Sequence, residues 1–126
     1  MSEESGIGEI VWRDLTVDKA EQVSDFYASV VGWQKSPVSM GDYEDFNMNT
    51  SDGETIAGVC HARGGNADIP PQWMMYVRVK NVNESLEHVR ALGGRVLKGP
   101  TDFSGDRYYI IEDPAGAILT IFSTLN

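Results

Sequence analysis

His61, Cys60 and Asp14 have side chains of the types that take part directly in reactions. An imidazole titrates near neutral pH, so His61 could act as a general acid or base, oriented across a sheet by Asp14. The alternative is a strand-end histidine that faces solvent or bonds to the following loop. Cys60 precedes His61, but neighbouring residues of a regular strand point to opposite faces. The two cannot share one pocket, and a buried structural thiol is the expectation for Cys60.

Other side chains suit the binding of a small organic molecule. Tyr76 and Arg78 alternate with Met74 along one stretch and offer a phenol and a cation to an anionic or carbonyl-bearing ligand. A salt bridge, for example between Arg78 and Asp14, is an equal alternative. Trp12 and Met74 suit the floor of an apolar pocket, although simple core filling explains them nearly as well.

Thr120 could donate a hydrogen bond to such a ligand, or it could merely satisfy the propensity of a strand. Together with the residues above, it completes one predicted set of ligand-binding side chains. The set is Trp12, Asp14, Thr16, Met74, Tyr76, Arg78 and Thr120.

These residues must be positioned by regular elements of the fold. The sequence predicts a strand followed by a helix, and this strand-helix unit occurs twice. Residues 11–17 alternate with the period of a strand, and residues 18–32 carry apolar side chains at helical spacing, with Asp18 as N-cap and Gly32 as the stop. Residues 73–94 repeat the pattern, with Asn81 as N-cap. The offset is constant, because 74 − 12, 79 − 17 and 94 − 32 all equal 62.

Shorter strand-like stretches follow each helix. They cover residues 43–49 and 55–62 in the first half and residues 95–98, 107–112 and 117–124 in the second. Each half therefore reads as a strand, a helix and two or three strands. Such a duplication predicts a pseudo-twofold α+β protein with a cleft between or across its halves.

One domain is expected over residues 1–126. Module one covers about residues 8–62 and module two residues 73–124. The connector, residues 63–72, is rich in glycine and ends near paired prolines, which suit neither helix nor strand.

The composition limits the kinds of molecule that the protein is expected to bind. Nineteen acidic residues against ten basic ones give a net charge of −9, which disfavours nucleic acid and anionic membranes as partners. A single cysteine, Cys60, precludes an internal disulfide and suits a reducing compartment. The acidic segment Met1 to Gly6 lacks the features of a secretory signal, and no apolar run approaches a membrane span, so the cytoplasm is expected.

The order of short motifs resembles the vicinal oxygen chelate superfamily of glyoxalases, bleomycin-resistance proteins and extradiol dioxygenases. Phe26-Tyr27 with Val31-Gly32-Trp33 resembles the end of the family's first helix. Val79-Lys80-Asn81-Val82 resembles its strand-to-helix turn, and Asp113-Pro114-Ala115-Gly116 its DPxG turn. The resemblance implies two tandem βαβββ modules that form a curled mixed sheet around a shared cavity, with helices outside. It also implies a homodimer.

In metal-dependent members, the first and last strands of each module supply one His or Glu apiece. The resemblance places those positions at Trp12, Ala57, Met74 and Thr120, none of which is a plausible ligand. Asp14 and His61 are expected to face the same way as Trp12 and Ala57, but two donors make a poor metal site. No metal and no cofactor are therefore expected.

The sequence predicts a small-molecule-binding member of this superfamily without its divalent metal. Two alternatives remain open. One is a metal-dependent lyase or dioxygenase with unusual donors such as His61, Asp14 and Glu112. The other is a noncatalytic interaction subunit, whose cavity would be filled by its own side chains.

Overall fold

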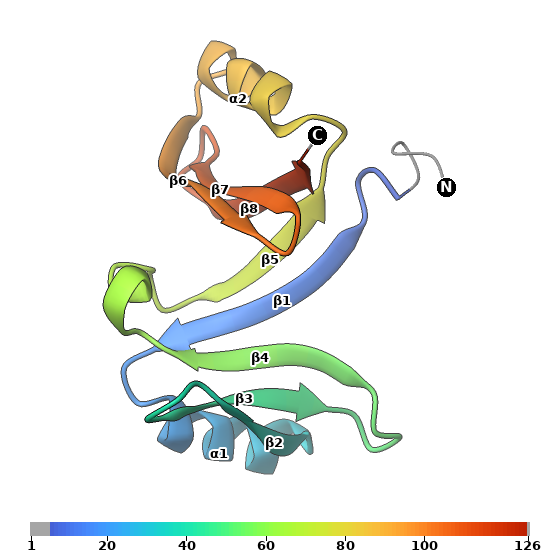
Figure 1. Ribbon diagram of the computed structural model, residues 1–126, viewed down its shortest axis with the longest axis vertical. Helices are drawn as coiled ribbons and strands as arrows, with labels where there is room; N and C mark the ends of the chain where they lie inside the picture. The colour runs from blue at the N-terminus through green and yellow to red at the C-terminus, as the bar shows by residue number, and fades with distance from the viewer. Residues whose placement is uncertain (1–5, 126) are drawn as a thin grey trace. The chain divides into compact units, whose positions relative to one another are not determined.

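The computed structural model describes residues 6–125, so the predicted acidic N-terminal segment lies outside it except for Gly6. Over this range the chain forms eight strands, two α-helices and a short 3-10 turn, and the βαβββ order occurs twice (Figure 1). The elements are β1 (Ile10–Val17), α1 (Ala20–Val31), β2 (Gln34–Ser39), β3 (Glu44–Asn49), β4 (Thr55–His61), η1 (Gly64–Asn66), β5 (Trp73–Arg78), α2 (Val82–Ala91), β6 (Arg95–Phe103), β7 (Asp106–Glu112) and β8 (Ile118–Thr124). The predicted α+β class and repeated module are confirmed.

The chain divides into two compact units. The N-terminal unit comprises residues 12–73, and the described part of the C-terminal unit comprises residues 74–125 together with residues 6–11. Backbone hydrogen bonds explain why the start of the chain belongs to the second unit, since Gly8 N donates to Arg78 O and Arg78 N donates to Glu9 O. Each unit is described by itself below.

In the N-terminal unit the strand order is β2-β3-β4-β1. β1 runs parallel to β4, whereas β3 is antiparallel to both β2 and β4. α1 covers one face of this sheet and closes a core of Ala20, Phe46, Met48, Ala57 and Val59. The apolar stripe of the helix thus meets the apolar side of the strands, as its 3.6-residue period requires.

The two ends of α1 are formed differently. Gly32 has a φ of 80° and ends the helix in the predicted left-handed conformation, and its N–H bonds to Ala28 O. The prediction of Asp18 as the N-cap is wrong: Lys19 occupies that position, and no side chain caps this end. The sheet-facing packing of Ala20 holds the first turn in place instead.

The glycine-tryptophan pair after α1 leads into an aromatic cluster of the N-terminal unit. Trp73 Nε1 donates a hydrogen bond to the Tyr27 hydroxyl at 3.1 Å. The Trp33 and Trp73 rings meet edge to face with centroids 5.7 Å apart. These contacts hold the C-terminal end of α1 against Trp73, the first residue of β5, within this unit.

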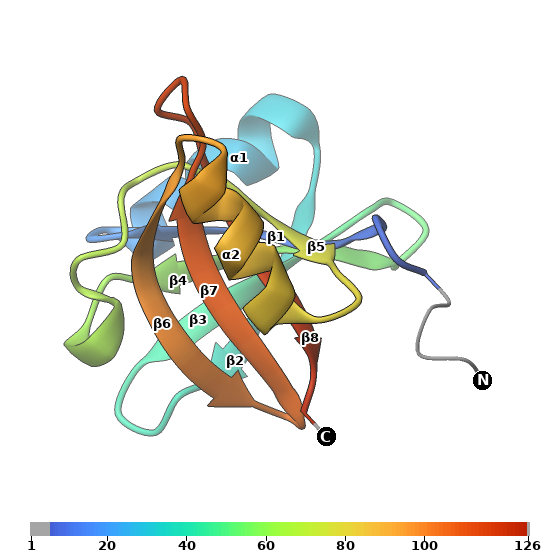
Figure 2. The same cartoon turned by 90° about the horizontal axis from the view of Figure 1, so that it is seen from above.

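In the C-terminal unit the strand order is β5-β8-β7-β6, with β5 and β8 parallel. α2 packs against β6, β7 and β8 (Figure 2). Val82, Leu86 and Ile121 form its buried core. The Asn81 side chain accepts hydrogen bonds from Asn83 N and Glu84 N, which confirms the predicted N-cap.

The strands differ from the sequence prediction in two places. β2 was not predicted, because Gln34-Lys35-Ser36-Pro37-Val38-Ser39 has little apolar alternation; β2 is the edge strand and packs less of its surface. β6 extends to Phe103, beyond the predicted end at Lys98, since it pairs with β7 past a register shift.

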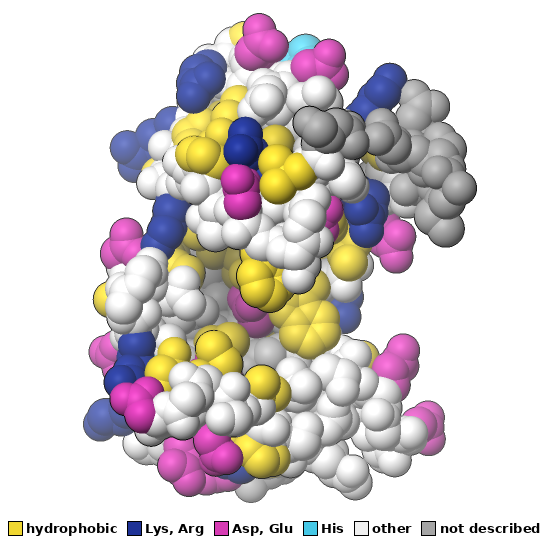
Figure 3. Space-filling view, viewed as in Figure 1, with side chains coloured by type: hydrophobic (Ala, Val, Ile, Leu, Met, Phe, Trp, Pro, Cys, Tyr) yellow, Lys and Arg dark blue, Asp and Glu magenta, His cyan; other side chains and the backbone are white. Residues whose placement is uncertain are grey.

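Surface charge is dispersed on the face shown in Figure 3, where acidic and basic side chains are interspersed. Neither helix in residues 6–125 has the length and apolar character needed to cross a bilayer.

Candidate functional site

Within each unit, a helix covers one face of the strands and no helix covers the other, which we call the helix-free face. In the N-terminal unit the register pairs Asp14 with Gly58 and Thr16 with Cys60. Paired residues share a face, so Asp14 and Thr16 lie on the helix-free face, and Trp12 shares it by the period of the strand. A Cβ added at Gly58 would be 3.4 Å from Trp12 Cζ2. The glycine therefore leaves room for the indole ring.

Ala57 and His61 lie on the other face. Ala57 is fully buried in the core beneath α1, and His61 pairs with Val17, which also packs against that core. The prediction that these two residues face the same way as Trp12 is wrong. A difference of one residue in strand register exchanges the two faces, and the sequence pattern alone did not settle the register.

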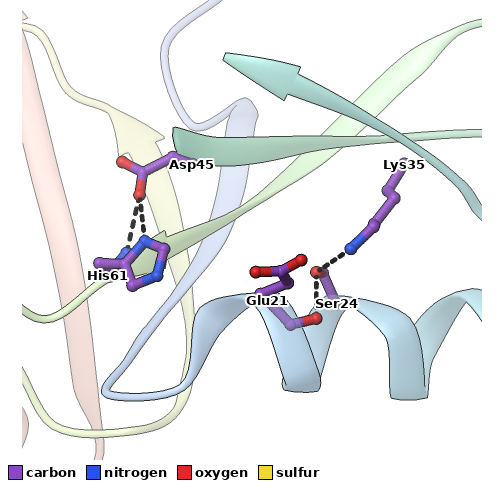
Figure 4. Close-up of polar contacts among 5 residues, drawn as sticks. All are labelled: Glu21, Ser24, Lys35, Asp45 and His61. Atoms are coloured by element: carbon purple, nitrogen blue, oxygen red, sulfur yellow. Dashed lines mark hydrogen bonds and ion pairs between the residues drawn. The ribbon is translucent and has the colours of Figure 1, made fainter. Parts of the chain in front are cut away.

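His61 is oriented by Asp45, which the sequence analysis did not single out, and not by Asp14. Asp45 Oδ1 accepts the backbone N–H of His61 at 2.9 Å and lies 3.1 Å from His61 Nδ1 (Figure 4). Tyr43 meets the imidazole edge to face, with ring centroids 5.4 Å apart. Asp45 is only 9% exposed. The imidazole is thus held by a nearly buried carboxylate from β3.

Cys60 is half-buried on the helix-free face beside Thr16. Burial, the negative charges of Asp14 and Asp45 and a hydrogen bond with Asp45 together raise the pKa of its thiol to about 12. A thiol with such a pKa is protonated and unreactive at neutral pH, in agreement with the predicted structural role.

Four predicted ligand-binding residues share the helix-free face of the C-terminal unit. Tyr76 pairs with Thr120, and Arg78 pairs with Phe122. Met74 lies two residues before Tyr76 and shares this face by the period of the strand. The remaining three predicted residues, Trp12, Asp14 and Thr16, belong to the N-terminal unit.

Aromatic rings that the sequence analysis missed complete this face. Tyr108 pairs with Phe122, and their rings stack with centroids 5.1 Å apart. The Arg78 guanidinium lies 5.0 Å from the centroid of the Phe122 ring. Tyr76 meets Tyr108 at 6.1 Å. The alternation within residues 106–112 and 118–124 was the signal that could have identified Tyr108 and Phe122.

Burial raises the pKa of Tyr108; the charge of Asp106 acts in the same direction and that of Arg78 opposes it. Tyr108 therefore keeps its phenolic proton at neutral pH. It can donate a hydrogen bond as well as offer a ring surface.

Thr120 is the centre of this helix-free face, between Tyr76 on β5 and Ile110 on β7. Its side chain is 2% exposed, and its Oγ1 has no hydrogen-bond partner among residues 6–125. Buried hydroxyls are ordinarily hydrogen-bonded, so an unpaired one calls for an explanation.

The side chains at the positions that the family resemblance assigns to metal ligands are poor donors for a divalent ion. Trp12, Met74 and Thr120 offer an indole, a thioether and a neutral hydroxyl, and the fourth position lies at Ala57, on the wrong face. Within the described part of the chain, no three or more His, Cys, Asp or Glu side chains form a cluster that could hold a metal.

The alternative donors considered from the sequence do not converge within either unit. Asp14 and His61 lie on opposite faces of the N-terminal sheet. Glu112, in the C-terminal unit, is 2.8 Å from the guanidinium of Arg95.

Two βαβββ repeats, each with a helix on one face of its sheet, define the class of protein. The model of the Glyoxalase/Bleomycin resistance protein/Dioxygenase superfamily matches residues 6–121, and the chain belongs to this superfamily. The predicted resemblance is confirmed.

Individual relatives are more distant. The chain is 27% identical over 115 residues to the proteins named "Putative glyoxylase CFP32" of Mycobacterium bovis and Mycobacterium tuberculosis. This match covers 90% of the chain but 43% of each relative, so the chain spans less than half the length of these curated relatives.

Solved structures share the fold. Methylmalonyl-CoA epimerase from Mycobacterium tuberculosis matches with a TM-score of 0.55 and 12% identity, over 100% of this chain and 92% of the epimerase chain. Glyoxalase I from Zea mays matches with a TM-score of 0.58 and 17% identity, over 91% of this chain and 42% of the maize chain.

Proposed function

We propose that this protein binds a small organic molecule on the helix-free face of its C-terminal unit, without a divalent metal. The observation that carries the proposal is the unpaired Thr120 Oγ1 among residues 6–125. Leaving a buried hydroxyl unpaired costs about 1–3 kcal/mol, so a ligand that bonds to it recovers free energy on binding.

The neighbours of Thr120 suggest the chemistry of the ligand. Arg78 supplies a positive charge, and Tyr76 and Tyr108 supply phenols. The stacked rings of Tyr108 and Phe122 supply flat apolar area. This combination suits a flat or extended molecule with a carbonyl or carboxylate group.

Trp12, Asp14 and Thr16 form the second part of the proposed binding set, on the helix-free face of the N-terminal unit. Trp12 offers a ring for stacking, and Asp14 and Thr16 offer polar atoms. The absence of a metal is proposed from donor chemistry, since the residues at the superfamily's metal positions lack carboxylate and imidazole groups.

Binding can be measured by isothermal titration calorimetry with methylmalonyl-CoA, free coenzyme A, benzoate and pyruvate. A solved methylmalonyl-CoA epimerase is described in complex with methylmalonyl-CoA, and this motivates the first probe. We expect saturable binding of at least one carbonyl or carboxylate probe. Thr120→Val should weaken it about tenfold, the effect of one lost hydrogen bond.

Thr124→Val is the matched control, because Thr124 lies on the same strand and is exposed. It should leave the affinity unchanged. Equal affinity of the two variants, or no saturable binding of any probe, contradicts the proposal.

We also propose a cytoplasmic homodimer. The free thiol of Cys60 and the net charge of −9 suit a reducing, soluble environment. The superfamily resemblance and the exposed apolar side chains of Phe26 and Val30 on α1 support self-association. Sedimentation velocity tests it, and a clean monomer at micromolar concentration contradicts it.

A further inference from the structure

A groove lies on the opposite face of the N-terminal sheet from Trp12, between the start of α1 and the end of β4. Its volume is about 440 Å³ and it is open to solvent. Small-molecule sites commonly have volumes of several hundred Å³. The lining residues are Lys19, Glu21, Gln22, Asp25 and His61.

In its neutral form, His61 presents a hydrogen-bond acceptor to this groove. A carboxylate has only acceptor atoms, so the 3.1 Å contact with Asp45 Oδ1 requires the proton of the neutral imidazole on Nδ1. Nε2 is then the unprotonated nitrogen. The Tyr43 ring and the backbone bond from His61 N to Asp45 further restrict the imidazole. An oriented imidazole of this kind costs little conformational entropy on binding.

The charges along the groove are not equivalent. Asp25 is paired, because its Oδ1 lies 2.7 Å from Lys35 Nζ, which also donates to Ser24 Oγ (Figure 4). Lys35 is itself held over the Phe46 ring at 4.3 Å. The Asp25 charge is therefore already compensated within the protein.

Glu21 and Lys19 are in a different situation. Among residues 6–125, neither the Glu21 carboxylate nor the Lys19 ammonium has a hydrogen-bond or ion-pair partner, although both groups line the groove. Figure 4 shows the Glu21 carboxylate turned from α1 toward the strands that carry Asp45 and His61. Besides the paired Asp25, the groove thus contains one carboxylate and one ammonium that have no partner among residues 6–125, together with the Nε2 atom of His61.

We propose that this groove binds a small zwitterion of the free α-amino acid class. The ligand ammonium pairs with Glu21 and donates a hydrogen bond to His61 Nε2, while the ligand carboxylate pairs with Lys19. An ammonium group has three donors and no acceptor, so it matches a carboxylate and an unprotonated imidazole together. A second ligand site, on the α1 side of the sheet, follows from this arrangement.

Nuclear magnetic resonance of the histidine rings tests the proposal, because the chain has two histidines and His88 lies on α2 in the other unit. The probes are L-alanine, ethylamine, which lacks the carboxylate, and propionate, which lacks the ammonium. At low salt, we expect L-alanine to shift the His61 Cε1–H signal saturably and to leave His88 unchanged. Ethylamine and propionate should bind at least about tenfold more weakly, since each loses one charge-assisted contact.

Glu21→Gln and Lys19→Gln should each weaken L-alanine binding about tenfold. Both residues are exposed, so these variants should fold, which the amide spectrum verifies. Glu87→Gln on the exposed surface of α2 is the matched control and should bind like the original protein. An absent or unsaturable shift, equal shifts at His88, ethylamine as strong as L-alanine, or unchanged binding in both variants overturns the proposal.

Discussion

Asp45 and His61 are joined at two points by a single oxygen atom. Oδ1 of Asp45 accepts the backbone N–H of His61 at 2.9 Å and also lies 3.1 Å from its Nδ1. The carboxylate therefore ties the start of β3 to the end of β4 and orients the imidazole at the same time.

Replacing Asp45 by alanine should lower the free energy of unfolding by about 1–3 kcal/mol, because a partly buried N–H loses its acceptor. His61→Ala should cost less, since its backbone N–H still reaches Asp45. Urea denaturation measures both. A larger cost for His61→Ala would contradict the central role of the backbone bond.

Thr120→Val should leave the free energy of unfolding unchanged or raise it by about 1 kcal/mol, because it removes a hydroxyl that has no partner among residues 6–125. Val is close to Thr in shape, so little packing is lost. Thermal and urea unfolding without ligand test this expectation. A clear loss of stability would show that the hydroxyl has a partner in the folded protein.

Cys60 should react very slowly with iodoacetamide at pH 8 in the folded protein. A pKa raised from 9.0 to about 12 lowers the thiolate fraction about a thousandfold, and the thiolate is the reactive form. Mass spectrometry of the alkylated protein gives the rate. The same protein in urea is the control and should react rapidly; equal rates in the two states would refute the raised pKa.

The same pKa shift makes stability depend on pH. The folded state holds the thiol proton more tightly than the unfolded state, so this contribution is complete below about pH 9 and is lost as the pH rises toward 12. The free energy of unfolding should therefore fall over that interval. Cys60→Ala should reduce this fall, and an unchanged pH profile would contradict the assignment.

Protein purified without a histidine tag should contain less than one equivalent of divalent metal. The donors at the superfamily's metal positions explain this expectation, since Trp12, Met74 and Thr120 are poor ligands. Inductively coupled plasma mass spectrometry measures the content, and EDTA should leave the melting temperature unchanged. One tightly held equivalent of nickel, zinc, iron or manganese would contradict the metal-free proposal.

Local features of the structure were predictable where short-range chemistry decides them. Asn81 caps α2 through two hydrogen bonds to residues within three positions, and Gly32 ends α1 with a positive φ. Such contacts need only neighbouring residues. Asp18 is an example in which local prediction failed. The sequence allows it to cap the N-terminus of α1, but the helix begins one residue later, where Ala20 packs against the sheet.

Long-range pairing decided the remaining features. The edge strand β2 has no apolar alternation of its own and exists because β3 offers it a partner. The sequence pattern predicted that His61 faces the same way as Trp12. The parallel register of β1 and β4 instead pairs His61 with Val17, on the face that carries α1. The sequence did not indicate that Asp45 contacts His61, since only the pairing of β3 with β4 brings the two residues together.

The sequence alone determined the duplicated βαβββ order and the superfamily, because periodicity and turn residues are encoded locally and repeat at a constant offset. Through the family resemblance, it also predicted that Trp12, Met74 and Thr120 stand at metal positions of the superfamily. Only the tertiary structure decided which face His61 occupies, which carboxylate orients it and which hydroxyl is buried without a partner. The physical reason is that strand register and burial depend on pairing between distant segments, which local pattern does not specify.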